Sequence, residues 1–215
     1  MTTLSKQRPQ TDRQQYHHGD LAPELIRLAI EEIAGQGTDK LSLRSLARKA
    51  GVSQAAPYHH FASKNDLFVA IATKGFVELK GRLQSAQAKA SAPGEKLLEM
   101  GAAYVEFALD NQTIYQVMLG GLIPDFSKHP ALQSAAHTCF NELAESVNEL
   151  LPAEHSELER KQLSGVLLGA IHGISSLQAR RNESSENPPK SALGLNAAVA
   201  SDVKGSLRLL LKYYL

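Results

Sequence analysis

Apolar residues recur along most of the chain at the spacing of one face of an α-helix. Near the N-terminus, apolar side chains follow the i, i+4, i+7, i+8 rule at Leu21, Leu25, Leu28, Ala29 and Ile33. No segment alternates apolar and polar residues over the length of a strand, and no β-branched run lies between turn pairs. The pattern therefore predicts an all-α protein.

Glycine, proline and capping residues divide this pattern into about nine predicted helices. Ser42 and Ser53 stand where they can cap short helices, and Ser63-Lys64-Asn65-Asp66 resembles a capping box with Asp in place of Glu. The predicted helices cover 21–35, 43–50, 53–61, 64–90, 93–108, 112–119, 130–151, 153–181 and 195–214. They form a compact unit that ends near 61–67 and a larger bundle, joined by the helix that starts at Lys64.

Residues 43–61 have the form of a helix-turn-helix, whose second helix can enter the major groove of DNA. Gly51 tolerates the positive φ of the turn, and Val52 and Phe61 can close the small core. With Ser53 as N-cap, Pro57 falls at the fourth helical position and removes only the first intrahelical hydrogen bond. The outward side chains are short or hydrogen-bonding, as a groove requires: Gln54, Ala55, Ala56, Tyr58, His59 and His60.

Composition narrows the class of protein. The chain has 215 residues, enough for a core without external staples, and its single cysteine, Cys139, cannot form an internal disulfide. Its N-terminus lacks a signal peptide's apolar core, and no apolar run reaches the roughly 18 residues of a membrane span. We therefore expect a soluble, cytoplasmic protein. The net charge is +1, but residues 1–80 carry 11 Lys and Arg against 8 Asp and Glu, a mild bias that chance explains equally well.

Catalytic and metal-binding motifs are missing from the sequence. There is no GxSxG, GxxxxGK[ST], HExxH or CxxC. The adjacent His59 and His60 lie about 100° apart around a helix, so they cannot chelate one ion as an i, i+4 pair would. We expect no enzyme, no cofactor and no metal site; an enzyme hidden from these motifs would be a helical hydrolase or metal protein that uses His137 or His172.

The segment LSLRSLARKAGVSQAAPYHHFASKNDLF closely resembles the DNA-binding segment of the TetR/AcrR family of transcriptional repressors, with a GVS turn, Tyr-x-x-Phe and a following Lys. The preceding YHHGDL extends the resemblance, which covers 16–80 and fades beyond. It implies base or groove contacts from Gln54, Ala55, Ala56 and His59, with Ser53 leading the segment. It implies phosphate contacts from Ser42, Arg44, Tyr58, His60 and Lys64.

Two alternatives stay open within this module. Tyr58 and His60 could instead pack along the first helix of the chain. The basic residues Lys6, Arg8 and Arg13 could form a minor-groove arm, or belong to a disordered start over 1–15.

The segment LSGVLLGAIHGISSLQ places a glycine stripe on one helix face, which costs roughly 2 kcal/mol relative to alanine. Close approach of another helix, within the chain or from a second copy, would offset that cost. The resemblance implies a homodimer that pairs its last two long helices. The predicted interface consists of Gly165, Gly169, Gly173, Ile174, Leu177, Val199, Val203, Leu207 and Leu210. The His172-Gly173 pair resembles a C-terminal domain type named for Trp and His-Gly, but this chain has no Trp.

The same resemblance implies a mainly apolar effector cavity inside the bundle. Its candidate lining mixes aromatic, soft and titratable side chains, each of which could also be an ordinary core residue: Tyr104, Phe107, Tyr115, Met118, His137, Phe140 and His172.

The sequence thus predicts a ligand-responsive transcriptional regulator, a repressor that binds a palindromic duplex DNA operator as a homodimer and is released by a small molecule. We assign 1–15 to an arm, 16–66 to a helix-turn-helix DNA-binding domain and 67–215 to a ligand-binding and dimerisation domain. The alternative is a helical scaffold or partner-binding protein whose helix-turn-helix is a packing corner.

Overall fold

The computed structural model describes residues 21–183, 198–199 and 201–212, and within them the protein is all α-helical with no β-strand. The arm and most of the YHHGDL motif lie outside the described residues. The elements are α1 (Leu21–Gln36), α2 (Leu43–Lys49), the 3-10 turn η1 (Ala56–His59), α3 (Lys64–Gln87), α4 (Pro93–Asp110), α5 (Gln112–Leu119), the 3-10 turn η2 (Phe126–Lys128), α6 (Pro130–Leu150), α7 (Glu157–Glu183) and α9 (Val203–Leu210). The all-α prediction is confirmed.

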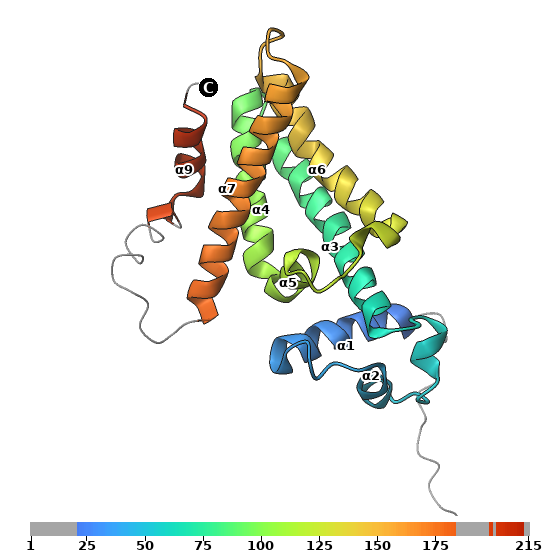
Figure 1. Ribbon diagram of the computed structural model, residues 1–215. Helices are drawn as coiled ribbons and strands as arrows, with labels where there is room; N and C mark the ends of the chain where they lie inside the picture. The colour runs from blue at the N-terminus through green and yellow to red at the C-terminus, as the bar shows by residue number, and fades with distance from the viewer. Residues whose placement is uncertain (1–20, 184–197, 200, 213–215) are drawn as a thin grey trace, which may run out of the picture.

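Two helical units share α3, as Figure 1 shows: α1, α2 and η1 lie at one end, and α3 runs from them into the bundle. Within the bundle α3 packs against α4, α5 and α6, while α7 and α9 cover α4. A single apolar core extends through both units, since residues of α1 and α2 join the same buried cluster as those of the bundle. The compact unit is therefore in physical contact with the bundle.

Ser63 begins α3 as its N-cap. The Ser63 hydroxyl accepts a hydrogen bond from the Asp66 N–H and donates one to the Asp66 carboxylate. The N-cap is the one expected, but the reciprocal bond of a capping box differs, because the Asp66 carboxylate accepts the Ser63 hydroxyl and not the Ser63 backbone N–H. Because the cap fixes the first turn, the start of the shared helix is set by a local sequence signal.

The segment after Gly51 is not the α-helix predicted over 53–61. It forms a single 3-10 turn, η1, in which the Ala55 carbonyl accepts the Tyr58 N–H and the Pro57 carbonyl accepts the N–H groups of His60 and Phe61. Pro57 has no N–H to continue an α-helical ladder, and it is buried. The Ser53 side chain makes no capping hydrogen bond to η1, which begins after Ala55.

A second correction concerns the start of α7, which begins at Glu157 and not at 153. The Ser156 hydroxyl accepts the Glu159 N–H, and the Glu159 carboxylate accepts the Ser156 N–H. This is a capping box that the sequence carries as S-x-x-E.

A buried carboxylate fastens α1 to α2. Glu32 is 4% exposed, and it accepts a hydrogen bond from the Ser45 hydroxyl at 2.7 Å and pairs with Lys49 at 2.8 Å. Burial raises the pKa of Glu32, but the hydrogen bonds from Lys49 and Ser45 and the charges of Lys49 and Arg48 outweigh it, so the net pKa is lowered.

No helix in the described part of the chain has both the length and the apolar character needed to cross a membrane.

Candidate nucleic-acid interface and cavity

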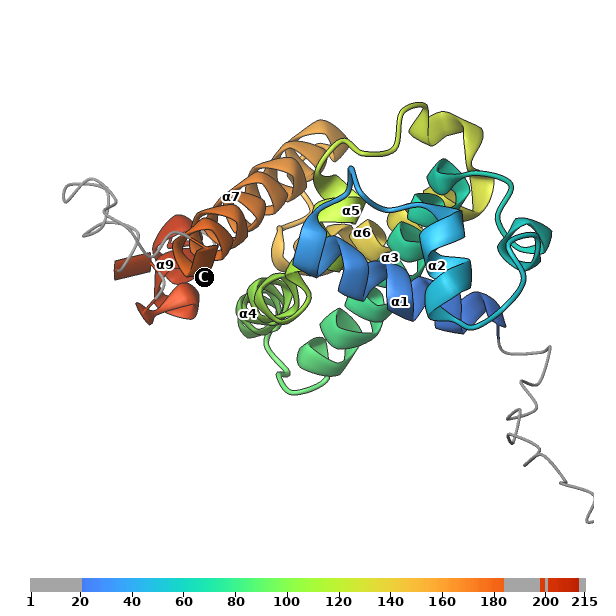
Figure 2. The same cartoon turned by 90° about the horizontal axis from the view of Figure 1, so that it is seen from below.

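The predicted DNA-reading residues lie on one exposed end of the molecule, which Figure 2 shows from below. Side chains of η1 and the preceding turn are exposed at Ser53, Gln54, Ala55, His59 and His60. Tyr58 is 48% exposed, so it does not pack into the core. Ala56 is half-buried, and because a 3-10 turn has three residues per turn, it shares a face with His59.

A groove of about 430 Å³ joins α2 to the turn before η1. Three predicted contact residues line it: Ser42, Arg44 and Gln54. Arg48 lines it too and is exposed in the last turn of α2. The sequence prediction missed Arg48, although it follows Arg44 by one helical turn and therefore lies on the same face.

Lys64 has a different setting from the other predicted phosphate contacts. It is half-buried, its ammonium donates a hydrogen bond to the Thr38 carbonyl at 2.5 Å, and it lies 5.6 Å from the Phe68 ring centroid. The side chain thus ties the start of α3 to the loop between α1 and α2.

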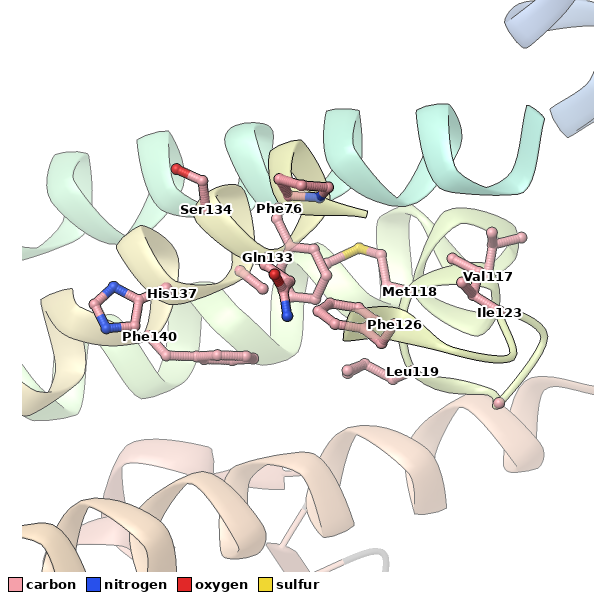
Figure 3. A pocket seen from close by; sticks show the side chains of 13 residues that line it. Phe76, Val117, Met118, Leu119, Ile123, Phe126, Gln133, Ser134, His137 and Phe140 are labelled. Atoms are coloured by element: carbon pink, nitrogen blue, oxygen red, sulfur yellow. The ribbon is translucent and has the colours of Figure 1, made fainter. Parts of the chain in front are cut away.

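The bundle holds a cavity of about 870 Å³ between α3, α5, the loop after α5 and α6. In its wall the Phe76 ring meets two other phenyl rings edge to face: its centroid is 5.6 Å from that of Phe140 and 6.5 Å from that of Phe126. Met118 points toward Phe76, and His137 lies at the opposite end of the close-up from Val117 and Ile123 (Figure 3). The polar lining side chains, Gln133, Ser134 and His137, all come from α6.

Four of the seven predicted lining residues lie outside this cavity. Met118, His137 and Phe140 line it, whereas Phe107 is fully buried under the Arg82 guanidinium. The other three form a polar cluster between α4, α5 and α7: Tyr104, Tyr115 and His172.

The polar cluster is continuous across three helices. The hydroxyls of Tyr104 and Tyr115 are 3.4 Å apart, and the Tyr115 hydroxyl is 2.5 Å from His172 Nδ1. Burial raises the pKa of both tyrosines, so both hydroxyls stay protonated and can donate. The cluster therefore joins α5, which lines the cavity, to α7.

The loop between α5 and α6 connects the cavity to the first turn of α3. Ile123 and Phe126 of this loop line the cavity, and His129 at its end has Nε2 3.3 Å from the Asn65 amide nitrogen. Asn65 follows Lys64 at the start of α3. One short segment thus contacts both the cavity and the first turn of α3, which adjoins the predicted DNA-reading residues.

The glycine stripe of α7 is open in the protomer. Gly165 and Gly169 are exposed, Gly173 is half-buried, and a Cβ on any of the three would meet no described atom within 4 Å. The contact that would offset the stripe is therefore not made among the described residues. Val166 beside the stripe is 57% exposed, and Leu177 is also exposed.

The interface prediction needs a correction for α9. Leu207 is 2% exposed and packs inward against Gly101, so it offers no surface to a second copy. Leu210 is exposed, while Val199, Val203 and Ile174 are half-buried.

Within the described residues no group of three or more His, Cys, Asp or Glu is arranged to hold a metal ion. Cys139 is fully buried, and burial raises the pKa of its thiol to about 12.

Comparisons with known proteins agree with both units. Residues 25–71 match the family model of bacterial regulatory proteins of the tetR family, and residues 97–193 match a tetracyclin repressor-like C-terminal domain. A Bacillus subtilis transcriptional regulator of helix-turn-helix type, YvdT, is 41% identical over 64 residues, or 28% of this chain. That match covers 33% of YvdT, so the chain spans about a third of this relative's length.

Solved structures resemble the chain over most of its length. A protein of unknown function from Rhodococcus sp. RHA1 is 29% identical, covers 90% of this chain and 98% of its own, and superposes with a TM-score of 0.67. AibR, solved with isovaleryl coenzyme A and operator DNA, is 15% identical and covers 73% of this chain and 86% of its own, with a TM-score of 0.57. A likeness at 15% identity shows only that AibR and this chain share a fold.

Proposed function

The chain belongs to the TetR family of bacterial regulatory proteins, and from that premise we propose that it is a dimeric, DNA-binding transcriptional repressor released by a small-molecule effector. The observation that carries this proposal is the exposed surface of η1 and α2, where Gln54 and Arg44 border one groove. Its amide and guanidinium groups can reach base edges and phosphates.

Each contact residue has its own expected role. Gln54 reads a base, since a side-chain amide can bond two edge atoms of adenine in the major groove. Arg44, Arg48, Tyr58 and His60 contact phosphate. A buried charge network around Glu32 supports α2, so the groove keeps its shape without DNA.

The test of DNA binding is selection of tight duplexes from a random pool, followed by titration at several salt concentrations. Counterion release makes affinity fall steeply with salt for a protein that neutralises phosphates. Arg44→Ala should lower by about 1 the slope of log affinity against log salt concentration. Gln54→Ala should change the difference in binding free energy between the preferred and other bases at one position by about 1–3 kcal/mol. Arg208→Ala on α9, far from η1, is the charge-matched control and should change neither (Figure 1). Weak binding with a flat salt response would instead indicate a helical scaffold.

A second copy is proposed to cover the open glycine stripe of α7. Useful specificity needs more than one small reading unit, which buries roughly 600–1,000 Å². Gly169→Arg adds a charge where the protomer has room, so it should give folded monomers in sedimentation equilibrium. Gly81→Arg, also exposed and open but on α3, is the control and should leave the dimer intact. A dimer that survives Gly169→Arg would place the interface elsewhere.

Effector control is proposed to act through the loop between α5 and α6. A ligand in the cavity contacts Ile123 and Phe126, and the loop carries this displacement to Asn65 through His129. Ligand and operator then favour different positions of α3, and each weakens the other's binding by the same factor. The AibR complex supports such a pairing of effector and operator in a protein of this fold.

A further inference from the structure

A second hollow adjoins the cavity along the same face of α6. This hollow of about 410 Å³ lies between α6 and the start of α7, and it shares His137 and Phe140 with the cavity. Lining residues on α6 run from Pro130 to Asn148, which is about 27 Å at 1.5 Å per residue. The two hollows therefore lie end to end along one face of α6, and together they are called the groove below.

The groove changes character from one end to the other. Phenyl, thioether and aliphatic groups line the α5 end, and no Asp, Glu, Lys or Arg is among the residues that line it. The α7 end is lined by Glu157, Arg160 and Lys161. A ligand that reaches from the apolar end to the junction at His137 and Phe140 must be apolar along its chain and polar at its head.

The charges at the α7 end favour an anion. Two cationic side chains and one carboxylate line it, which leaves a net charge of +1. Arg160 is fixed by hydrogen bonds to the carbonyls of Asn148 and Leu151 at the end of α6. Lys161 pairs with Glu157 at 2.6 Å, and both side chains are highly exposed, so water screens the pair and it adds little to stability. A ligand carboxylate can therefore replace Glu157 at little cost.

We propose that the groove binds an elongated amphipathic carboxylate, with its hydrocarbon chain among Phe76, Met118 and Phe126 and its head beside His137 and Lys161. His137 Nδ1 lies 3.3 Å from the Asn141 amide, which places two further hydrogen-bonding groups at the junction. This inference rests on the proposed function, because it gives the effector of that cavity its chemical class and orientation.

The test compares three probes of equal chain length on the protein without DNA. Decanoate and decylammonium are titrated by calorimetry below their micelle-forming concentrations, and decanol is titrated below its solubility limit. Decanoate should bind about threefold more tightly than decanol, as expected for one added ion pair at an exposed site, and decylammonium should bind most weakly.

Two lysine variants give the orientation. Lys161→Gln should weaken decanoate about threefold and leave decanol unchanged. Lys128→Gln is the matched control, since Lys128 is equally exposed, has its own local partner in Asp125 and adjoins the apolar end. Leu119→Gln, in the apolar wall, should weaken decanoate and decanol alike.

Three results would overturn the inference: decylammonium binding as tightly as decanoate, an effect of Lys128→Gln in place of Lys161→Gln, or no binding of any probe. Duplex titration of the same preparation separates the two proposals. Decanoate binding without duplex binding refutes the proposal that the protein is a DNA-binding regulator and keeps the proposed ligand class. Duplex binding without decanoate binding refutes the ligand class and keeps the regulator.

Discussion

Two glycines of α3 provide a matched test of how closely α5 packs on it. Gly75 is buried, and a Cβ there would lie 2.4 Å from Met118 Sδ and 2.6 Å from Ile114 Cγ2, both on α5. Gly81 lies on the same helix, is exposed and has no described atom within 4 Å of such a Cβ. Alanine adds the same methyl group at both positions, so only the packing differs.

The expected effects have opposite signs. Gly81→Ala should raise the free energy of unfolding by about 0.5–1 kcal/mol through helix propensity. At Gly75 the same gain is offset by an overpacking cost of about 1–3 kcal/mol, which leaves a net loss of about 1–2 kcal/mol. Met118 lines the cavity and can swing toward it, whereas Ile114 is β-branched and stiff.

Urea unfolding and thermal melting measure both variants. The two variants should differ by about 1.5–3 kcal/mol in stability, and so by about 3–12 °C in melting temperature, since each kcal/mol shifts a domain of this size by about 2–4 °C. Gly75→Ala should also weaken any cavity ligand, because the displaced Met118 takes its space. Equal stabilisation by both alanines would refute the close approach of α3 and α5.

Three further predictions concern single side chains. Glu32→Gln should lower the free energy of unfolding by about 1–3 kcal/mol at pH 7. Because the folded-state pKa of Glu32 is lowered, the stability that its carboxylate contributes is full above the unfolded-state pKa of about 4.3 and is lost as the pH falls through the folded-state pKa. Urea unfolding of both proteins at pH 3 and pH 7 measures this, and a difference that does not change with pH would contradict it. Cys139 should react with a thiol reagent at pH 8 only at the rate of unfolding, since burial raises the pKa of its thiol to about 12, and rapid labelling of the native protein would contradict its burial. His129→Ala and Asn65→Ala should each keep the affinities for operator and effector within about threefold but reduce the coupling factor, by which each ligand weakens binding of the other. Duplex titration with and without effector measures this factor. An unchanged coupling factor would show that coupling takes another route.

The sequence predicted most helices because their signals are local. Ser42 and Ser63 both cap helices as expected, and the breaker at Gly120 ends α5 where predicted. η1 was assigned the wrong type because Pro57 is compatible with either helix at an N-terminus, and the choice depends on its burial against the rest of the unit. That burial is a tertiary property.

The site was predictable to the extent that exposure follows from a local pattern. The residues around Gln54 are exposed because the turn that carries them is short and polar. For the cavity, residue type alone could not separate Met118, which lines it, from Tyr115, which lies three residues earlier and turns toward His172. Phe126 was missed because the loop after Gly121 carries no periodic pattern, although it supplies a wall.

The shared helix α3 has a geometric consequence for the proposed control of DNA binding. Its 24 residues make a rigid lever about 36 Å long, so a 5° pivot at the bundle end swings the capped end by roughly 3 Å. In a symmetric pair two such swings change the spacing of the reading units by up to about 6 Å, a sizeable part of the roughly 34 Å between successive major-groove faces. A very small motion of the wall around Phe76 would be enough to make the spacing of the two reading units differ from that of successive major-groove faces.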